Sequence, residues 1–202
     1  MLIVLGVLIG LSTHTVVNCG DEDEPDICSA VIGFSPFRGS LIAFAYEGRG
    51  RIALRHGAYG RALADFNEAI HLNPNRASLY RDRAQAYRQN GELGLAIADY
   101  DEAIALDPKL AAPYHQRALA LAAKGDLDRA ILSYSTAVRL DPSDAQARLD
   151  RGLAFLARGQ ADDARADFEA ALALPPGKDG RTRDAARAKL AELSSAASAP
   201  RR

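Results

Sequence analysis

Prolines recur at a spacing of 34 residues, and a leucine stands two residues before each of them. The four pairs are Leu72 with Pro74, Leu106 with Pro108, Leu140 with Pro142, and Leu174 with Pro176. A period between about 20 and 50 residues indicates stacked copies of one supersecondary unit. Each copy buries its apolar surface only against its neighbours. The period therefore predicts a repeat array, not a globular domain with one unique core.

The period divides the chain into four units, residues 43–76, 77–110, 111–144 and 145–178, with the proline at position 32. In every unit position 8 is Gly or Ala, position 15 is Gly, positions 20 and 27 are Ala, and position 24 is Phe or Tyr. Small residues let two helices approach closely, and the aromatic ring fills the layer between them. Gly at position 15 favours a left-handed helix end, and Pro at position 32 stops a helix. Each unit is therefore predicted to be an antiparallel helix pair.

On these positions the chain resembles the tetratricopeptide-repeat (TPR) family over about two-thirds of its length. Position 4 also holds the large residue of the TPR pattern in three units, but Arg148 stands there in the fourth. The resemblance implies an all-α fold, a right-handed TPR superhelix (α-solenoid) of four helix pairs. A capping helix over 179–194 would close the array, with Ala185, Ala188, Leu190 and Leu193 on its packed face. Residues 195–202 are small and polar, and we expect them to be disordered.

Position 7 is arginine in all four units, where the TPR pattern often has leucine. Position 23, on the facing helix of the same unit, is acidic in three units and Ser133 in the third. One hypothesis is a ladder of arginines that binds phosphate or carboxylate ligands. The acid repeats together with the base, which favours structural ion pairs instead. The predicted pairs are Arg49 with Asp65, Arg83 with Asp99, and Arg151 with Asp167.

In TPR arrays the first helix of each unit lines the concave face. The resemblance implies a face that is polar and basic in the first two units and apolar in the last two, where the closing helix could cover it. The basic end suits an acidic peptide or a C-terminal carboxylate, since opposite charges attract. Scattered surface arginines with no partner are the alternative. The candidate partner-binding residues are Glu47, Arg51, Arg55, Arg81, Gln85, Arg88, Gln89 and His115.

An unbroken apolar run over residues 2–11 opens the chain. Ten residues cannot cross a bilayer as a helix, which needs about 20, but they fit the apolar part of a secretory signal. No Lys or Arg precedes the run, and a buried hydrophobic helix is the alternative. We predict a signal or hydrophobic leader over 1–18, with membrane contact only through this leader. The predicted location is periplasmic or secreted in a bacterium, or else membrane-anchored through this segment.

Cys19 and Cys28 lie in the next segment, residues 19–42, where we expect a short helix over 24–34 and then a linker. Two cysteines in an exported chain favour one disulfide, and a reduced pair is the alternative. A closed zinc site would need further ligands that the segment lacks. The order of leader, two cysteines, short helix and repeats is similar to exported bacterial TPR proteins.

The formal net charge of −1 lacks the basic excess that a nucleic-acid-binding domain usually shows. The four histidines are scattered, and no nucleophile–base set, phosphate-binding Gly loop or metal-ligand cluster is visible. We therefore expect no enzyme activity, cofactor, metal or small-molecule substrate. The predicted function is a scaffold that binds a peptide or protein through the concave TPR face. The alternative is an architectural or self-associating subunit of a cell-envelope complex.

Overall fold

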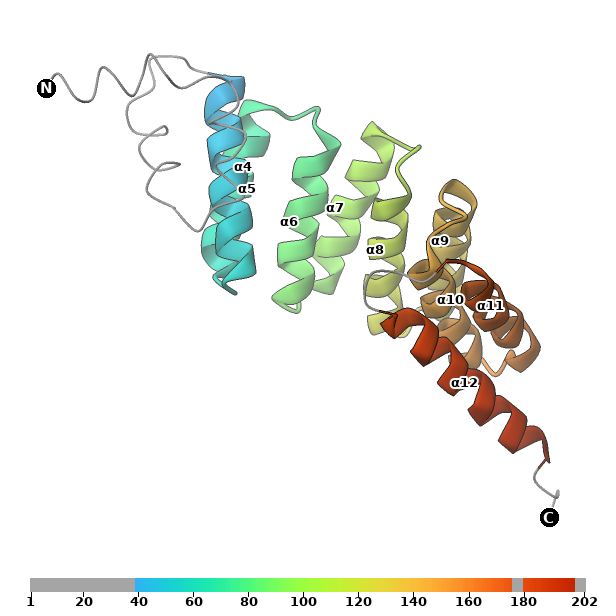
Figure 1. Ribbon diagram of the computed structural model, residues 1–202. Helices are drawn as coiled ribbons and strands as arrows, with labels where there is room; N and C mark the ends of the chain where they lie inside the picture. Colours follow the sequence, from blue (N-terminus) through green and yellow to red (C-terminus); the bar gives the residue numbers. More distant parts are fainter. Residues whose placement is uncertain (1–38, 176–179, 199–202) are drawn as a thin grey trace, which may run out of the picture. The chain divides into compact units, whose positions relative to one another are not determined.

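The computed structural model describes residues 39–175 and 180–198, and within these ranges it contains helices and their connections but no strand. The described residues form two compact units, one up to Leu106 and one from Asp107 onward, and each is considered by itself. The first unit contains α4 (Ser40–Arg55), α5 (Tyr59–Leu72), α6 (Ala77–Gln89) and α7 (Leu93–Leu106). The second contains α8 (Ala111–Ala123), α9 (Leu127–Leu140), α10 (Ala145–Ala157), α11 (Ala161–Ala173) and α12 (Arg181–Ser198) (Figure 1).

The helices form pairs that correspond to the four repeats, and two pairs stack in each unit. In the first unit α4 packs against α5 and α6 against α7, while α5 and α6 join the pairs. In the second unit α8 packs against α9 and α10 against α11, while α9 and α10 join the pairs. The all-α fold class and the pairing predicted from the period are both present.

Glycine ends the first helix of every pair. The position-15 glycines have positive φ angles: 72° at Gly57, 85° at Gly91, 82° at Gly125 and 79° at Gly159. A residue with a Cβ pays a steric cost in this left-handed region, whereas glycine does not. The chain can therefore reverse within a short turn and start the second helix antiparallel to the first.

In the first three repeats the second helix ends two residues before its proline, at Leu72, Leu106 and Leu140. Asn73 and Asp141 have extended φ angles of −143° and −128°, the conformation that a following proline imposes. The carboxylate of Asp141 accepts hydrogen bonds from the hydroxyl and the backbone N–H of Ser143, at 2.6 and 3.0 Å. These bonds lower the pKa of Asp141 and hold the turn that leads into the next repeat.

The aromatic residues at position 24 form the centre of each helix pair. Phe66, Tyr100, Tyr134 and Phe168 are all buried, as are the alanines at positions 20 and 27. Gly152 lies so close to Phe168 that a Cβ added to it would be 2.5 Å from the ring carbon Cε1. The small residues at position 8 are thus required by the space that the ring occupies.

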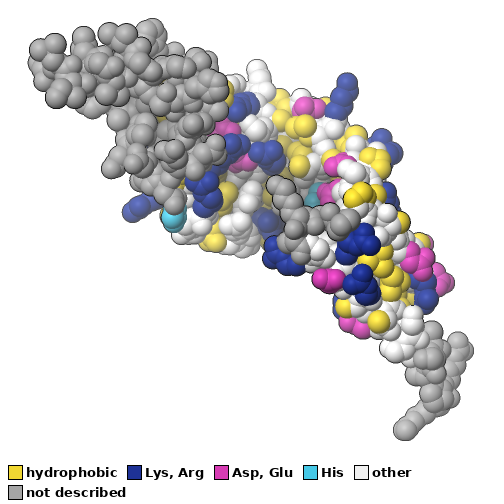
Figure 2. Space-filling model, viewed as in Figure 1, with side chains coloured by type: hydrophobic (Ala, Val, Ile, Leu, Met, Phe, Trp, Pro, Cys, Tyr) yellow, Lys and Arg dark blue, Asp and Glu magenta, His cyan; other side chains and the backbone are white. Residues whose placement is uncertain are grey.

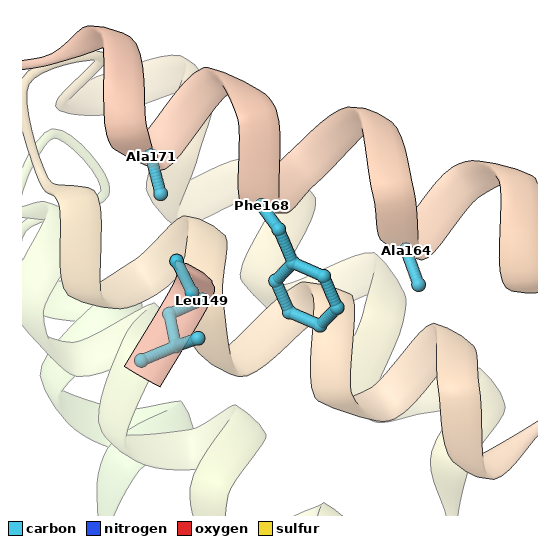
Figure 3. Close-up of a cluster of buried hydrophobic side chains, with 5 residues drawn as sticks. Leu149, Ala164, Phe168 and Ala171 are labelled. Atoms are coloured by element: carbon cyan, nitrogen blue, oxygen red, sulfur yellow. The ribbon is translucent and has the colours of Figure 1, made fainter. Parts of the chain in front are cut away.

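The closing helix α12 packs against α10 and α11. Ala186 is fully buried in a cluster with Leu149, Phe168 and neighbouring alanines, and Leu190 and Leu193 pack against that cluster. Figure 3 shows Leu149, Ala164, Phe168 and Ala171 of this cluster. The prediction of Leu190 and Leu193 for the packed face is confirmed. The prediction of Ala185 and Ala188 is wrong, because both are exposed and Ala186 takes the buried position between them.

Helix boundaries differ from the expected ones at both ends of the described chain. The first repeat helix begins at Ser40, ahead of residue 43. The closing helix continues past residue 194 to Ser198, into the segment expected to be disordered. Alanine and serine at its end extend the helix at little cost, since alanine has the highest helix propensity.

The predicted leader, the short helix over 24–34, Cys19 and Cys28 lie outside the described residues, so their export and disulfide roles stay predictions. Among the helices that are described, none is both long enough and apolar enough to cross a membrane.

Candidate partner-binding face

The first helices of neighbouring repeats lie side by side in each unit, where α4 contacts α6 and α8 contacts α10. We call the surface that these helices present the first-helix face. The sequence places all eight candidate partner-binding residues on it. In Figure 2, basic and acidic side chains lie next to one another over the α4–α7 part of the chain, on the side in view.

The structure brings the three predicted Arg–Asp pairs together. Arg83 donates from Nε and Nη2 to the two carboxylate oxygens of Asp99, each at 2.7 Å. Arg49 makes the same two-pronged contact with Asp65, at 2.9 and 2.7 Å. Arg151 does so with Asp167, at 2.7 and 2.6 Å. These hydrogen bonds raise the pKa of all three guanidinium groups, although burial opposes the rise.

The position-7 arginines also connect successive repeats. Nη1 of Arg83 donates to Asn67 at 2.7 Å, and Nη1 of Arg151 donates to Ser135 at 3.1 Å. Both acceptors belong to the second helix of the preceding repeat. The Arg83 guanidinium also lies over the ring of Tyr80, 5.6 Å from its centroid. These arginines are therefore committed to contacts within the protein, which supports the structural pairing over a ligand-binding ladder.

The third repeat keeps the arginine but lacks the acid. Arg117 donates from Nε to the hydroxyl of Ser133 at 3.2 Å, and that hydroxyl donates to the carbonyl oxygen of Arg129 at 2.9 Å. Arg117 also lies over Tyr114, 5.5 Å from the ring centroid. The guanidinium thus keeps the same place in the repeat when serine replaces the acid.

Asp82 organises the first-helix face of the first unit. Its side chain is buried, and Oδ2 accepts a hydrogen bond of 2.6 Å from Nε of Arg51. Oδ1 accepts two from Arg81, at 3.0 Å from Nε and 2.8 Å from Nη2. One buried carboxylate therefore orients two arginines that come from different repeats. Both arginine side chains stay partly exposed, Arg51 by 43% and Arg81 by 33%.

Glu47 is only 2% exposed, which differs from its expected role in binding a partner. Its carboxylate lies 2.8 Å from Nη2 of Arg51 and 2.9 Å from Nη1 of Arg76. Burial raises the pKa of Glu47, and the two arginines counteract part of that rise. A carboxylate in this position holds arginines in place and is not accessible to a partner.

The four other candidates in the first unit remain at or near the surface. Arg55 and Gln89 are exposed, and Gln85 and Arg88 are half-buried. The Arg88 guanidinium lies near the buried hydroxyl of Tyr100, whose pKa is raised by burial and partly lowered again by that arginine. The Nε of Arg88 is buried and has no hydrogen-bond partner.

His115 joins two repeats in the second unit. Its Nε2 lies 2.8 Å from Oδ2 of Asp150 on α10, and its Nδ1 lies 3.8 Å from Asp144. Asp150 also accepts a hydrogen bond of 3.0 Å from Gln146, whose amide oxygen accepts one of 2.7 Å from Thr182 on α12. His115 is thus mainly engaged within the protein, although it was expected to face a partner.

The rest of the first-helix face in the second unit is apolar, as expected. Leu153 is 38% exposed, and Leu119 is half-buried. Leu149 is buried in the cluster that contains Ala186 of α12, and Leu156 is partly buried because it packs against that cluster. The closing helix therefore covers part of the apolar surface and leaves Leu153 accessible.

Sequence reasoning missed Arg76, Asp144 and Asp150 as members of these networks. A signal was present at position 6, which is Asp82 in the second repeat and Asp150 in the fourth. Both carboxylates bond to a base on the first helix of the preceding repeat. Within residues 39–175 and 180–198, no group of three or more His, Cys, Asp or Glu side chains could hold a metal ion.

Two family models match the chain, and both describe the tetratricopeptide repeat. One matches residues 49–124 and the other residues 115–179, so together they cover four repeats almost completely. No curated protein matches the chain significantly in sequence.

Solved structures show the same fold. A crystal structure of MamA is 24% identical with a TM-score of 0.67, over 73% of this chain and 84% of that one. YrrB, described as a TPR protein with an unusual peptide-binding site, is 22% identical with a TM-score of 0.62, over 73% and 74%. The first TPR of Spaghetti (RPAP3), bound to the HSP90 peptide SRMEEVD, is 23% identical with a TM-score of 0.58, over 60% and 98%. The fold is that of a TPR solenoid, and the chain belongs to the tetratricopeptide-repeat family.

Proposed function

We propose that the protein is a non-catalytic scaffold that binds an acidic peptide or protein segment through its first-helix face. One observation carries the proposal: buried Asp82 and Glu47 hold arginines in fixed positions while those arginines stay partly exposed. A preorganised arginine loses little side-chain freedom on binding, so more of the interaction energy appears as affinity. The repeated positions pack the fold, whereas the positions on this face vary between repeats and are the ones that can select a partner.

The comparisons support a role in protein interaction. Among structures with the same fold, YrrB is described as having a peptide-binding site, and the first TPR of Spaghetti is bound to a peptide. In TPR arrays the first helices line the concave side, which is the side that the resemblance assigns to partner binding. A fold hosts many functions, so the choice of an acidic partner rests on the arginines of this chain and not on its relatives.

A second candidate function is an architectural role through the opposite surface. Leu132 on α9 is 68% exposed, the most exposed of the large hydrophobic residues in the described part of the chain. It lies on a second helix, away from the first-helix face. An exposed leucine favours contact with another protein through the second helices, although single exposed hydrophobic residues are common on protein surfaces.

Site-specific photo-crosslinking in living cells separates the two functions. A photoreactive amino acid is placed at Gln85 on α6, at Thr136 on α9 near Leu132, or at Glu68 on α5 as a control. We expect a partner adduct from the Gln85 position and none from Glu68. An adduct from Thr136 alone would contradict binding through the first-helix face and would favour the architectural role.

We also propose that the chain is exported, on the basis of the apolar run over residues 2–11. Fractionation of cells of the native host that produce a C-terminally tagged protein is expected to recover it in the periplasm or medium. Intact-mass measurement should then show a chain that lacks the leader. An unprocessed chain in the cytosol would contradict export and, with it, a disulfide between Cys19 and Cys28.

A further inference from the structure

The arginines of the first unit form a connected network on the first-helix face. Arg76 contacts Glu47, Glu47 contacts Arg51, Arg51 donates to Asp82, and Asp82 accepts from Arg81. The two acidic residues are buried, since Glu47 is 2% and Asp82 is 4% exposed, so their carboxylates lie beneath the arginines. Positive groups therefore face outward, and the acids that hold them are shielded from a ligand.

The network has an excess of positive charge. Arg81 and Arg88 both lie on α6, about two helical turns apart and so on the same side of that helix. Both also lower the pKa of the buried Tyr100 hydroxyl, which is consistent with one shared region of the face. Four guanidinium groups, on Arg51, Arg76, Arg81 and Arg88, thus accompany two carboxylates, which leaves a formal excess of two positive charges. An anion with two negative charges would balance this excess, whereas a single carboxylate would balance only half of it.

Arg88 provides a second, independent observation. Its Nε is buried and has no hydrogen-bond partner, although buried donors are nearly always paired in folded proteins. An arginine can satisfy this donor by reorienting toward an acceptor that arrives with a ligand. The Nε of Arg88 is therefore a donor that the described part of the protein does not use.

We propose that Arg81 and Arg88, supported by Arg51, bind a phosphoryl group carried by a side chain of the protein partner. A phosphate monoester has a charge of about −1.5 to −2 at neutral pH and three strong acceptor oxygens. Arginine guanidinium groups pair with such oxygens through parallel hydrogen bonds. The inference rests on the proposed binding function and adds to it the chemical class of the group that is recognised.

Fluorescence anisotropy of labelled peptides tests the proposal with the full chain. The probes are an acidic Asp/Gly peptide with a central phosphoserine, the same peptide with serine, and the same peptide with glutamate. We expect the phosphorylated peptide to bind at least about tenfold more tightly than either of the others, because of its additional charge and acceptors. Inorganic phosphate in the millimolar range should compete with it.

Variants assign the binding to the arginine network. Arg88→Gln removes a positive charge and the unpartnered Nε donor, and we expect it to weaken phosphopeptide binding by about tenfold. Arg61→Gln, an exposed substitution on α5, is the matched control and should leave binding unchanged. Arg81→Lys keeps the charge but loses the planar guanidinium, which can donate two parallel hydrogen bonds. It should weaken binding of the phosphopeptide more than binding of the serine peptide. Thermal unfolding of each variant verifies that it folds.

Each contrary outcome has a defined meaning. Equal binding of the three peptides, weakened throughout by Arg88→Gln, would overturn phosphoryl recognition but leave the acidic-partner function intact. Phosphopeptide binding that Arg88→Gln leaves unchanged would overturn the site. Binding only to vesicles that contain a phosphoinositide would overturn a protein partner as the source of the group. Inorganic phosphate that binds as tightly as the phosphopeptide would also overturn a protein partner as the source of the phosphoryl group. A Gln85 crosslink without any peptide binding would overturn the phosphoryl inference alone.

Discussion

The variant Asp99→Asn is expected to lose about 3 kcal/mol of unfolding free energy, because it leaves a mostly buried guanidinium without its countercharge. The Arg83 side chain is 19% exposed, and both of its bonds to Asp99 are 2.7 Å long. Asparagine keeps the shape of the side chain, but an NH2 group replaces one of the two acceptor oxygens. This NH2 group would then face an N–H donor of Arg83. The estimate lies at the lower end of the range for broken buried pairs, since Arg83 retains some contact with solvent.

Urea denaturation followed by circular dichroism measures this change as a lower transition midpoint at an unchanged slope. Glu102→Gln removes an exposed charge from the same helix, α7, and should alter stability by less than about 0.5 kcal/mol. The double variant Arg83→Gln with Asp99→Asn should lose less than the sum of the single losses, since neither charge then stays unpaired. An Asp99→Asn protein as stable as the natural chain would contradict a stabilising role for these pairs.

Gly152→Ala is expected to lower stability by about 1–2 kcal/mol, even though alanine is the better helix former. The added Cβ would lie 2.5 Å from Cε1 and 2.9 Å from Cδ1 of Phe168. Phe168 is fully buried among Leu149, Ala164 and Ala171, so its ring has little room to move (Figure 3). Overpacking costs about 1–3 kcal/mol, which exceeds the gain of up to about 1 kcal/mol from replacing a helical glycine.

Gly94→Ala is the matched control, because Gly94 also lies in a helix but has no atom within 4 Å of the added Cβ. This variant should be as stable as the natural chain or more stable, by up to about 1 kcal/mol. Combining Gly152→Ala with Phe168→Leu should recover part of the loss, since leucine leaves space for the methyl group. If Gly152→Ala and Gly94→Ala stabilise the protein equally, close packing does not explain the glycine at position 8.

Most of the fold could be predicted from the sequence because it depends on local chemistry repeated four times. Glycine at position 15 and proline at position 32 determine where helices end, whatever the rest of the chain does. The Arg83–Asp99 pair was also predictable, because it joins the two helices of one repeat and recurs with the period. A feature that is local and repeated leaves its signal several times in one sequence.

The Glu47–Arg76 and Arg51–Asp82 contacts could not be derived in the same way. Arg51 and Asp82 lie on different repeats, 31 residues apart. Arg76 is the last residue of the first repeat, in the turn before α6, and lies 29 residues from Glu47. Whether a polar side chain on a helix faces solvent or the neighbouring repeat depends on how closely two first helices approach. The sequence therefore marked Glu47 as a surface residue, and the structure shows it buried between arginines.

The closing helix likewise has one property that the sequence predicts and one that it does not. Its presence follows from the alanines and leucines after residue 180, but its rotation about its own axis depends on the shape of the surface that it covers. Ala186 fits against Leu149 and Phe168, whereas Ala185 and Ala188 face solvent.

The 34-residue period by itself determined the helix pairs, their turns and the family, because each rests on short-range steric and packing rules. Only the tertiary structure decided which charged side chains are buried between repeats and which remain available to a partner. That choice depends on the distance between neighbouring helices and on the desolvation of each charge, and neither quantity is encoded in a single repeat.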